Sequence, residues 1–306
     1  MTDNQPIRAL ITGADGQLGQ SFQQLRQTAA HAEIELIYAA RQALDICDAD
    51  RIGSFLDATP VDAVVNAAAY TAVDAAESNG QQAERVNAVA PGLLAQACRQ
   101  RNIWMLHIST DYVFDGKKSE PYREDDAVNP LSVYGKTKLA GEQAVLRASP
   151  NAAILRTSWV FSPFSRNFLK TMLAMAQSRT ELNIVNDQFG GPSYAGDIAA
   201  VLLRLIDQHF NASPVAAGIY HLAGTPHVSW LDFSNNIFKQ ATELGLLAQA
   251  PKIHGIPSSS YPTPAPRPAN SRLSNAKLEK LLGDLDCDWR LGVRESLLYL
   301  KAKNAP

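Results

Sequence analysis

The 306-residue sequence predicts an α/β protein whose main part is a Rossmann-like, doubly wound parallel sheet. One observation is that short, continuous apolar runs alternate with longer stretches of helical periodicity through the first half of the chain. Apolar runs of this kind are typical of strands that are buried on both faces. A second observation is the glycine-rich turn between the first apolar run and the first helical stretch. Because alternating strands and helices form βαβ units with right-handed crossovers, we expect helices on both faces of the sheet.

The first half of the chain provides most elements of this sheet. The apolar runs that predict strands are 8–12, 36–38, 62–66 and 104–109, and the clearest helical stretches are 17–25, 81–101 and 134–147.

The second half is less regular. Its predicted elements are helices at 168–177, 197–208 and 230–244 and a strand at 218–222. Five prolines between residues 256 and 268 predict an extended loop, because proline fixes φ and disfavours helix in the residue before it. A chain of this length is typical of two domains of ~150 residues each. We expect a Rossmann domain at 1–165 and a smaller α/β domain at 166–306, and it stays open whether segments near 184–223 rejoin the first domain.

The composition excludes several classes of protein. The chain is 46% hydrophobic and 19% charged, which is ordinary for a globular protein and unlike a disordered or fibrous one. No apolar run approaches the ~20 residues of a membrane span. A net charge of −2 without a dense Lys/Arg stripe argues against nucleic acid as a partner. The three cysteines lie far apart and form no metal-ligand pattern, which indicates reduced thiols. We therefore expect a cytoplasmic protein that binds neither membrane nor nucleic acid.

The turn after the first predicted strand reads Thr-Gly-Ala-Asp-Gly-Gln-Leu-Gly over residues 12–19. Gly13, Gly16 and Gly19 allow a tight turn, a close approach of a pyrophosphate and packing of the following helix. Gln17 and Leu18 open that helix, whose N-terminal N–H groups and dipole favour phosphate. This context predicts the phosphate turn of a nicotinamide dinucleotide site, although the spacing is GxxGxxG rather than GxGxxG. The alternative is a turn that only requires positive φ.

The residues after the second predicted strand concern the adenosine end of such a cofactor. An acid in this place would hold the ribose 2′-hydroxyl, but the chain reads Tyr-Ala-Ala-Arg over 38–41. Arg41 can instead meet a 2′-phosphate, which favours NADPH over NADH or tolerates both. Asp45 and Ile46 are candidates to cap the adenine. The alternatives are a solvated surface arginine for Arg41 and an ordinary turn residue for Asp45.

Tyr134 and Lys138 stand four residues apart in a predicted helix and therefore on one face of it. The pKa of a free tyrosine is about 10, and a nearby lysine ammonium is expected to lower the pKa of Tyr134 enough for acid–base work. Thr110 ends a predicted strand at the sheet edge where ligands bind, so its hydroxyl can hydrogen-bond a substrate carbonyl beside Tyr134. A Tyr-x-x-x-Lys pattern alone carries a high false-positive risk. The glycine turn, the strand-end hydroxyl and the pair in this order are a far more specific signal.

Together these residues resemble those of the extended short-chain dehydrogenase/reductases. More specific motifs, spread over nearly the whole chain, resemble the dTDP-4-dehydrorhamnose reductase family. These motifs are Asn-Ala-Ala-Ala-Tyr-Thr-Ala-Val-Asp (66–74), Ser-Thr-Asp-Tyr-Val-Phe (109–114), Tyr-Gly-Lys-Thr-Lys-Leu-Ala-Gly-Glu (134–142), Arg-Thr-Ser-Trp-Val (156–160), Asn-Asp-Gln-Phe-Gly (186–190) and Tyr-Pro-Thr-Pro-Ala (261–265) with Arg267 and Pro268.

The resemblance implies reduction of the C4 ketone of dTDP-4-dehydro-L-rhamnose with NADPH or NADH. The product would be dTDP-L-rhamnose, in the last step of its biosynthesis for cell-surface polysaccharide. Tyr134 would protonate the developing alkoxide, Lys138 would tune Tyr134 and hold the nicotinamide ribose, and Thr110 would hydrogen-bond the reacting oxygen. The first domain would bind the cofactor and the second would mainly bind the sugar nucleotide.

The resemblance also implies further binding residues. Those expected along the cofactor form one turn, made of Ala67, Ala68, Ala69, Tyr70 and Thr71. Asp111, Trp159 and Asn167 would contact the sugar nucleotide, with the indole of Trp159 as an apolar wall. The alternatives are a core tryptophan for Trp159 and a helix-cap asparagine for Asn167.

A metal is not expected. Some members of the family are described with a magnesium-linked dimer built on glutamates, but residues 193–197 read Ser-Tyr-Ala-Gly-Asp and form no such cluster. We therefore predict no bound metal and leave a homodimer open. None of the six histidines has ligand spacing, and His107 and His221, which lie in apolar strands, are predicted to be core residues.

Two other functions stay open. One is another sugar-nucleotide epimerase or reductase of the same superfamily; a 4,6-dehydratase is disfavoured because Tyr112 stands where a dehydratase places the glutamate of its Asp–Glu pair. The other is a non-catalytic subunit resembling the regulatory β-subunit of methionine adenosyltransferase. Intact Thr110, Tyr134 and Lys138 favour catalysis, although a fold can outlive its activity.

Overall fold

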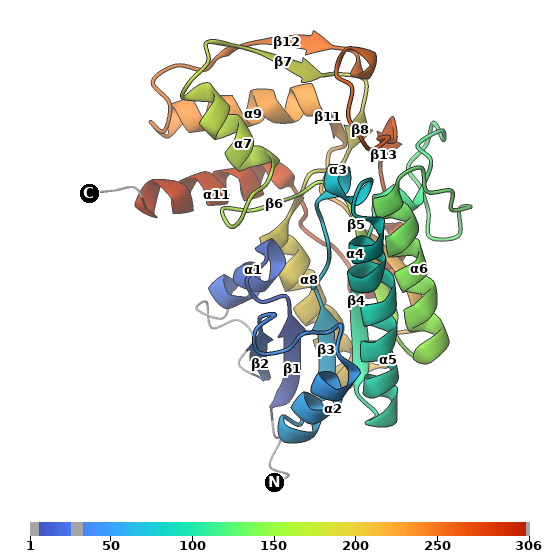
Figure 1. The fold of residues 1–306 in the computed structure, drawn as a ribbon. Helices are drawn as coiled ribbons and strands as arrows, with labels where there is room; N and C mark the ends of the chain where they lie inside the picture. The colour runs from blue at the N-terminus through green and yellow to red at the C-terminus, as the bar shows by residue number, and fades with distance from the viewer. Residues whose placement is uncertain (1–5, 26–32, 304–306) are drawn as a thin grey trace.

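The computed structural model describes residues 6–25 and 33–303, and its centre is a parallel sheet of six strands (Figure 1). In spatial order the strands are β10 (Gly218–Leu222), β5 (Ala153–Thr157), β4 (Trp104–Thr110), β3 (Ala63–Asn66), β1 (Ile7–Thr12) and β2 (Ile34–Ala39). The chain passes from β1 to β2 on one side and then crosses to β3 on the other side of β1. In an open parallel sheet, such a reversal creates a ligand crevice at the carboxyl ends of the strands.

Helices cover both faces of the sheet, as a doubly wound fold requires (Figure 1). α1 (Gln17–Leu25) and α8 (Ala195–Asp207) pack on one face, and α2 (Ala49–Ala58), α5 (Ala90–Gln100) and α6 (Val133–Ala148) pack on the other. Each face of the sheet has its own hydrophobic core, and alternate side chains of β1 pack into the two cores. Ile11 packs on the side of α1, and Leu10 packs on the side of α2. The predicted fold class is confirmed.

The remaining elements form a smaller part with its own core, seen at the top of Figure 1. β7 (Glu181–Val185) pairs in parallel with β12 (Lys252–Ile256), beside α7 (Phe168–Ala176), α9 (Trp230–Glu243) and α11 (Trp289–Lys303). Buried aromatic side chains, such as Phe161, Phe233 and Trp289, fill this core.

The shorter elements of the whole structure are α3 (Val73–Ala76), α4 (Gly80–Glu84), β6 (Val160–Phe161), β8 (Phe189–Gly190), β9 (Ser193–Tyr194), β11 (Val228–Ser229), β13 (Asn270–Ser271) and α10 (Ala276–Leu282).

Most of the predicted elements are present, with two differences. The helix expected at 81–101 is divided by a π-helical turn (Arg85–Val89) between α4 and α5. β5, β7, β12 and several helices were not predicted. β10 and α8 lie in the segments near 184–223 whose place the sequence left open, and both join the main sheet: β10 pairs with β5, and α8 packs against the sheet. No helix within residues 6–25 and 33–303 has the length and apolar character that a bilayer crossing requires.

Candidate active site

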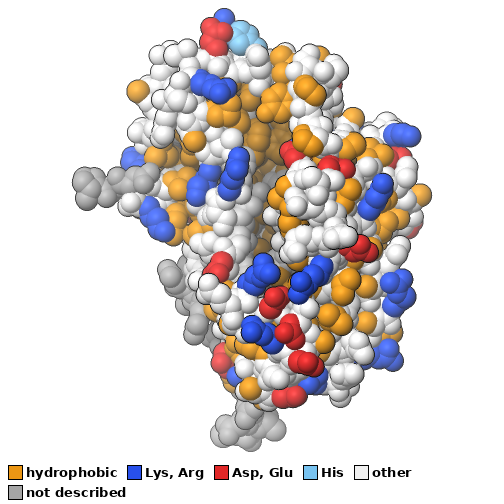
Figure 2. All heavy atoms as spheres, viewed as in Figure 1, with side chains coloured by type: hydrophobic (Ala, Val, Ile, Leu, Met, Phe, Trp, Pro, Cys, Tyr) orange, Lys and Arg blue, Asp and Glu red, His pale blue; other side chains and the backbone are white. Residues whose placement is uncertain are grey.

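A cavity of about 800 Å³ opens at the carboxyl ends of the sheet strands. Its walls come from the turns after β1 to β5, from the start of α6 and from residues 165–167 that lead into α7. Figure 2 shows the surface hollowed between the two parts of the molecule, with hydrophobic side chains inside the hollow and Lys and Arg side chains along it. Every residue that the sequence singled out for binding or catalysis lines this cavity, apart from Gly19.

The three glycines of the turn after β1 serve different purposes. Gly13 has a φ of 67°, and a Cβ there would lie 2.8 Å from the Ala68 nitrogen, so this turn packs directly against the turn after β3. A Cβ on Gly19 would lie 2.5 Å from the Ala14 Cα, which makes Gly19 a packing residue of the turn itself. A Cβ on Gly16 would meet only the Gly13 carbonyl oxygen, at 3.2 Å. That contact is tight, and Gly16 lines the cavity beside the N-terminus of α1, where the absence of a side chain suits a phosphate group.

The turn after β3 is held by a residue whose role the sequence did not reveal. The Tyr70 N–H donates a hydrogen bond to Asn87 Oδ1 (2.8 Å), and Asn87 Nδ2 donates one to the Tyr70 carbonyl oxygen (3.0 Å). Asn87 is fully buried in the π-helical turn, a type of irregularity that is common near functional sites. An asparagine within a buried helical stretch is the signal that could have identified it.

The residues after β2 form another wall of the cavity. Arg41 and Asp45 make an ion pair of 3.8 Å, and the Arg41 side chain is 74% exposed. The Cys47 N–H donates to Asp45 Oδ1 at 3.0 Å, and this backbone hydrogen bond lowers the pKa of Asp45. Ile46 is buried. This wall thus offers a cation and an apolar side chain close together in the sequence.

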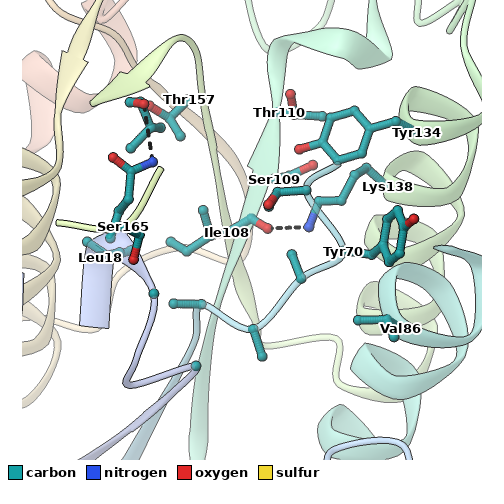
Figure 3. A pocket seen from close by; sticks show the side chains of 18 of the residues that line it. Leu18, Tyr70, Val86, Ile108, Ser109, Thr110, Tyr134, Lys138, Thr157 and Ser165 are labelled. Atoms are coloured by element: carbon teal, nitrogen blue, oxygen red, sulfur yellow. Dashed lines mark hydrogen bonds between the residues drawn. The ribbon is translucent and has the colours of Figure 1, made fainter. Parts of the chain in front are cut away.

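Tyr134, Lys138 and Thr110 converge on one wall of the cavity (Figure 3). Tyr134 and Lys138 point from the same face of α6 towards β4, as their spacing predicted. Lys138 Nζ donates to the Ile108 carbonyl oxygen at 2.7 Å. The Thr110 hydroxyl is in hydrogen-bonding contact with Tyr134 and also donates to Asp111 Oδ1 at 2.9 Å. Helix α6 starts where predicted, because the Ser132 hydroxyl accepts the Gly135 N–H as a cap.

The expectation that Lys138 lowers the pKa of Tyr134 is wrong for this structure. Burial raises the pKa of Tyr134, and the contact with Thr110 only partly opposes this. Lys138 is not among the groups that shift the pKa of Tyr134, and its ammonium donates to the Ile108 carbonyl oxygen. Burial lowers the pKa of Lys138 to about 8. A tyrosine with a raised pKa remains protonated at neutral pH, which is the form that can donate a proton.

The residues expected to meet the sugar nucleotide surround the same cavity. Burial raises the pKa of Asp111 to about 6. Trp159, with a φ of 49°, stacks on Trp230 with ring centroids 3.4 Å apart and an interplanar angle of 7°. Asn167 caps α7 by accepting the Lys170 N–H at 3.2 Å. The cap reading of Asn167 is therefore correct, and the residue lines the cavity as well.

Asn167 also connects the smaller part to the phosphate turn. Its Nδ2 donates to Gln17 Oε1 at 2.9 Å, and the Ser162 hydroxyl donates to the same oxygen at 2.9 Å. Gln17 thus fixes the start of α1 against the segment that leads into α7.

The histidines behave as predicted, since His107 and His221 are fully buried in strands. His107 Nδ1 is 3.1 Å from Asn66 Nδ2, and burial holds the pKa of His107 well below its ordinary value. Over the part of the chain that the structure describes, no group of three or more His, Cys, Asp or Glu side chains could hold a metal ion. The absence of a bound metal stays a prediction.

Comparisons with known proteins show what this chain is similar to. A family model described as the RmlD substrate binding domain matches residues 7–301. A dTDP-4-dehydrorhamnose reductase from Aggregatibacter actinomycetemcomitans is 43% identical over 292 residues, which cover 95% of this chain and 99% of that protein. The crystal structure of such a reductase from Clostridium acetobutylicum is 36% identical, with a TM-score of 0.87 over 96% of this chain and 100% of that one. Another from Bacillus anthracis, in complex with NADP, is 29% identical, with a TM-score of 0.84 over 98% and 100% of the two chains.

Proposed function

The chain belongs to the dTDP-4-dehydrorhamnose reductase family, and we propose that it reduces the C4 ketone of dTDP-4-dehydro-L-rhamnose to give dTDP-L-rhamnose. The cofactor in this proposal is a nicotinamide dinucleotide, either NADPH or NADH. One observation carries the proposal above the others. Tyr134, whose pKa is raised by burial, lies with Thr110 and Lys138 on the wall of a cavity that also includes the glycine turn before α1.

The cavity fits a dinucleotide at each of its parts. The cavity wall at Gly16 would take the pyrophosphate at the N-terminus of α1. Arg41 would meet a 2′-phosphate, with Asp45 and Ile46 near the adenine. The turn 67–71 would lie along the cofactor, and Lys138 would hold the nicotinamide ribose. When bound, the cofactor supplies the hydride.

Residues of the chain would then donate the proton and stabilise the negative charge that develops on the reacting oxygen. Tyr134, protonated at neutral pH, would donate its phenolic proton to the sugar O4 as negative charge develops there. The Thr110 hydroxyl would orient that oxygen beside the phenol. The Lys138 ammonium would stabilise the phenolate that remains if it turns from the Ile108 carbonyl oxygen towards Tyr134, because opposite charges interact strongly in a site with little water.

The sugar nucleotide is assigned to the side of the cavity formed by Asp111, Trp159 and Asn167. The Trp159 indole, fixed by its stack on Trp230, offers an apolar wall to a deoxysugar. We propose a matching division of the chain, in which residues 1–165 mainly bind the cofactor and 166–306 mainly bind the substrate. α8 and β10 are an exception because they pack with the main sheet. We also propose that the protein is cytoplasmic, and whether it forms a homodimer stays open.

The direct test is a coupled assay in which an upstream dehydratase and epimerase generate the ketosugar in place. Loss of NADPH or NADH absorbance that requires the sugar is the expected result. Tightly retained cofactor without net oxidation would instead indicate an epimerase. A folded protein that binds dinucleotide, shows no turnover and co-purifies with another enzyme would indicate a regulatory subunit.

A further inference from the structure

Two residues of the sequence motifs form an ion pair that the proposed chemistry does not use. Arg156 Nε and Nη2 donate hydrogen bonds to the two carboxylate oxygens of Glu142 at 2.8 and 2.7 Å. Both side chains are only 2% exposed. A buried ion pair is weak evidence for stability, because desolvation of the two charges offsets their attraction. The position of this pair suggests another use.

Glu142 continues the row of side chains that begins with the proton donor. Tyr134, Lys138 and Glu142 follow one another at intervals of four residues on one face of α6. All three contact residues 108–110 of β4, and the Ser109 hydroxyl donates to Glu142 Oε1 at 2.5 Å. The carboxylate of Glu142 therefore joins α6, β4 and, through Arg156, β5.

We propose that Glu142 and Arg156 are positioning residues for the reduction. The pair anchors α6 in the register that places Tyr134 beside Thr110, and it sets a carboxylate near the Lys138 ammonium. The expected effect on kcat rests on the proposed function. The expected effects on stability and on the pKa of Lys138 concern the free protein and do not depend on it.

The charges around Lys138 support this role. The titratable groups near its amine come from several elements. They are Tyr134 and Glu142 on α6, His107 on β4 and Tyr70 in the turn after β3. Arg156 on β5 is bonded to Glu142. His107 is neutral at pH 7 because burial lowers its pKa, and Tyr134 is neutral because burial raises its pKa. Burial lowers the pKa of Lys138 to about 8, and the negative charge of Glu142 opposes that fall. Loss of this charge should leave Lys138 easier to deprotonate.

The test compares Glu142→Gln with the double variant Glu142→Gln/Arg156→Met. The single variant keeps the shape but leaves Arg156 buried without a counter-charge, so its melting temperature should fall. In the double variant neither charge remains, and the melting temperature should recover. In both variants the pKa of Lys138 should fall by roughly one unit or more. This pKa is measured by NMR titration of the Lys138 ¹³Cε signal, which is assigned by its absence in Lys138→Arg. In both, kcat should fall by roughly ten- to a hundredfold with little change in KM, as expected of misplaced reacting groups.

A matched control is Asp57→Asn, which removes the Asp57–Arg101 pair of 2.8 Å; neither residue lines the cavity. It should leave both the Lys138 titration and kcat as in the wild type. If the double variant regains stability together with wild-type kcat and wild-type Lys138 titration, the pair is merely structural and the proposal is wrong. If Glu142→Gln does not fold, the double variant decides alone. If even the wild type lacks turnover, the proposed function fails, while the NMR titration still tests the pair.

Discussion

The ammonium of Lys138 lies 2.7 Å from the carbonyl oxygen of Ile108, so the backbone of β4 and not a carboxylate is its direct hydrogen-bond acceptor. Lys138 is 2% exposed. A cation in this setting is costly to bury, which is why the pKa of Lys138 falls to about 8.

Lys138→Met should therefore change stability in a pH-dependent way. Because the pKa of Lys138 drops from 10.5 to about 8 on folding, the wild type loses stability as the pH falls from 10.5 to 8, and the loss is complete below about 8. At 1.36 kcal/mol per unit, this loss is about 3 kcal/mol. The free energy of unfolding of the variant, relative to wild type, should rise by up to that amount between pH 10.5 and pH 7. Urea unfolding at both pH values measures it.

Lys136→Met, on the exposed side of the same helix, is the control and should show no such pH dependence. A stability difference for Lys138→Met that is equal at both pH values would contradict the assignment of a buried charge.

Tyr134→Phe should remove the proton donor and leave the cavity intact. We expect kcat to fall by about 10²- to 10⁴-fold, the range for a lost general acid. Cofactor affinity, measured by NADPH fluorescence, should stay close to wild type. Tyr112→Phe is a suitable control, because the Tyr112 hydroxyl accepts from Arg267 at 3.0 Å and its ring packs edge-on against Tyr134. Wild-type turnover in Tyr134→Phe would refute its role.

Arg41→Ala should weaken NADPH more than NADH. A lost charge-assisted contact to a phosphate costs about 1.5–3 kcal/mol, which is about tenfold or more in affinity. The measurement is the dissociation constant of each cofactor with each protein, with Arg41→Lys to separate charge from geometry. Equal weakening of both cofactors would place Arg41 away from the 2′-phosphate.

Trp159→Ala should raise the KM for the sugar nucleotide by roughly tenfold, because the apolar wall and its stack on Trp230 are lost. Trp159→Phe should keep most of the affinity. A change in cofactor KM with an unchanged sugar KM would assign Trp159 to the cofactor instead.

Most of the features that the sequence could predict depend on residues close together in the chain. Examples are the glycine turn, the helix from Ser132 onward and the one-sided placement of Tyr134 and Lys138. β5 was missed because Arg156 interrupts its apolar run, and this arginine is tolerated there only because Glu142 neutralises it from another element. The role of Asn87 was not predicted for a similar reason, since its partner Tyr70 lies 17 residues away.

The error about the pKa of Tyr134 has a different origin. Spacing places Lys138 on the correct face of α6, but it does not say where the ammonium points. The orientation depends on the Ile108 carbonyl oxygen of β4, which accepts from the ammonium at 2.7 Å. Burial of the phenol then determines the direction of the shift.

The central claim is that hydride reaches the sugar C4 while Tyr134 supplies the proton to O4. The most direct measurement uses NADPH carrying deuterium at the transferred position of its nicotinamide ring, with dTDP-4-dehydro-L-rhamnose generated in place, and NMR of the product. We predict dTDP-L-rhamnose with deuterium at C4 from the wild type and almost none from Tyr134→Phe. Label at another carbon, or equal labelling by Tyr134→Phe, would contradict the account.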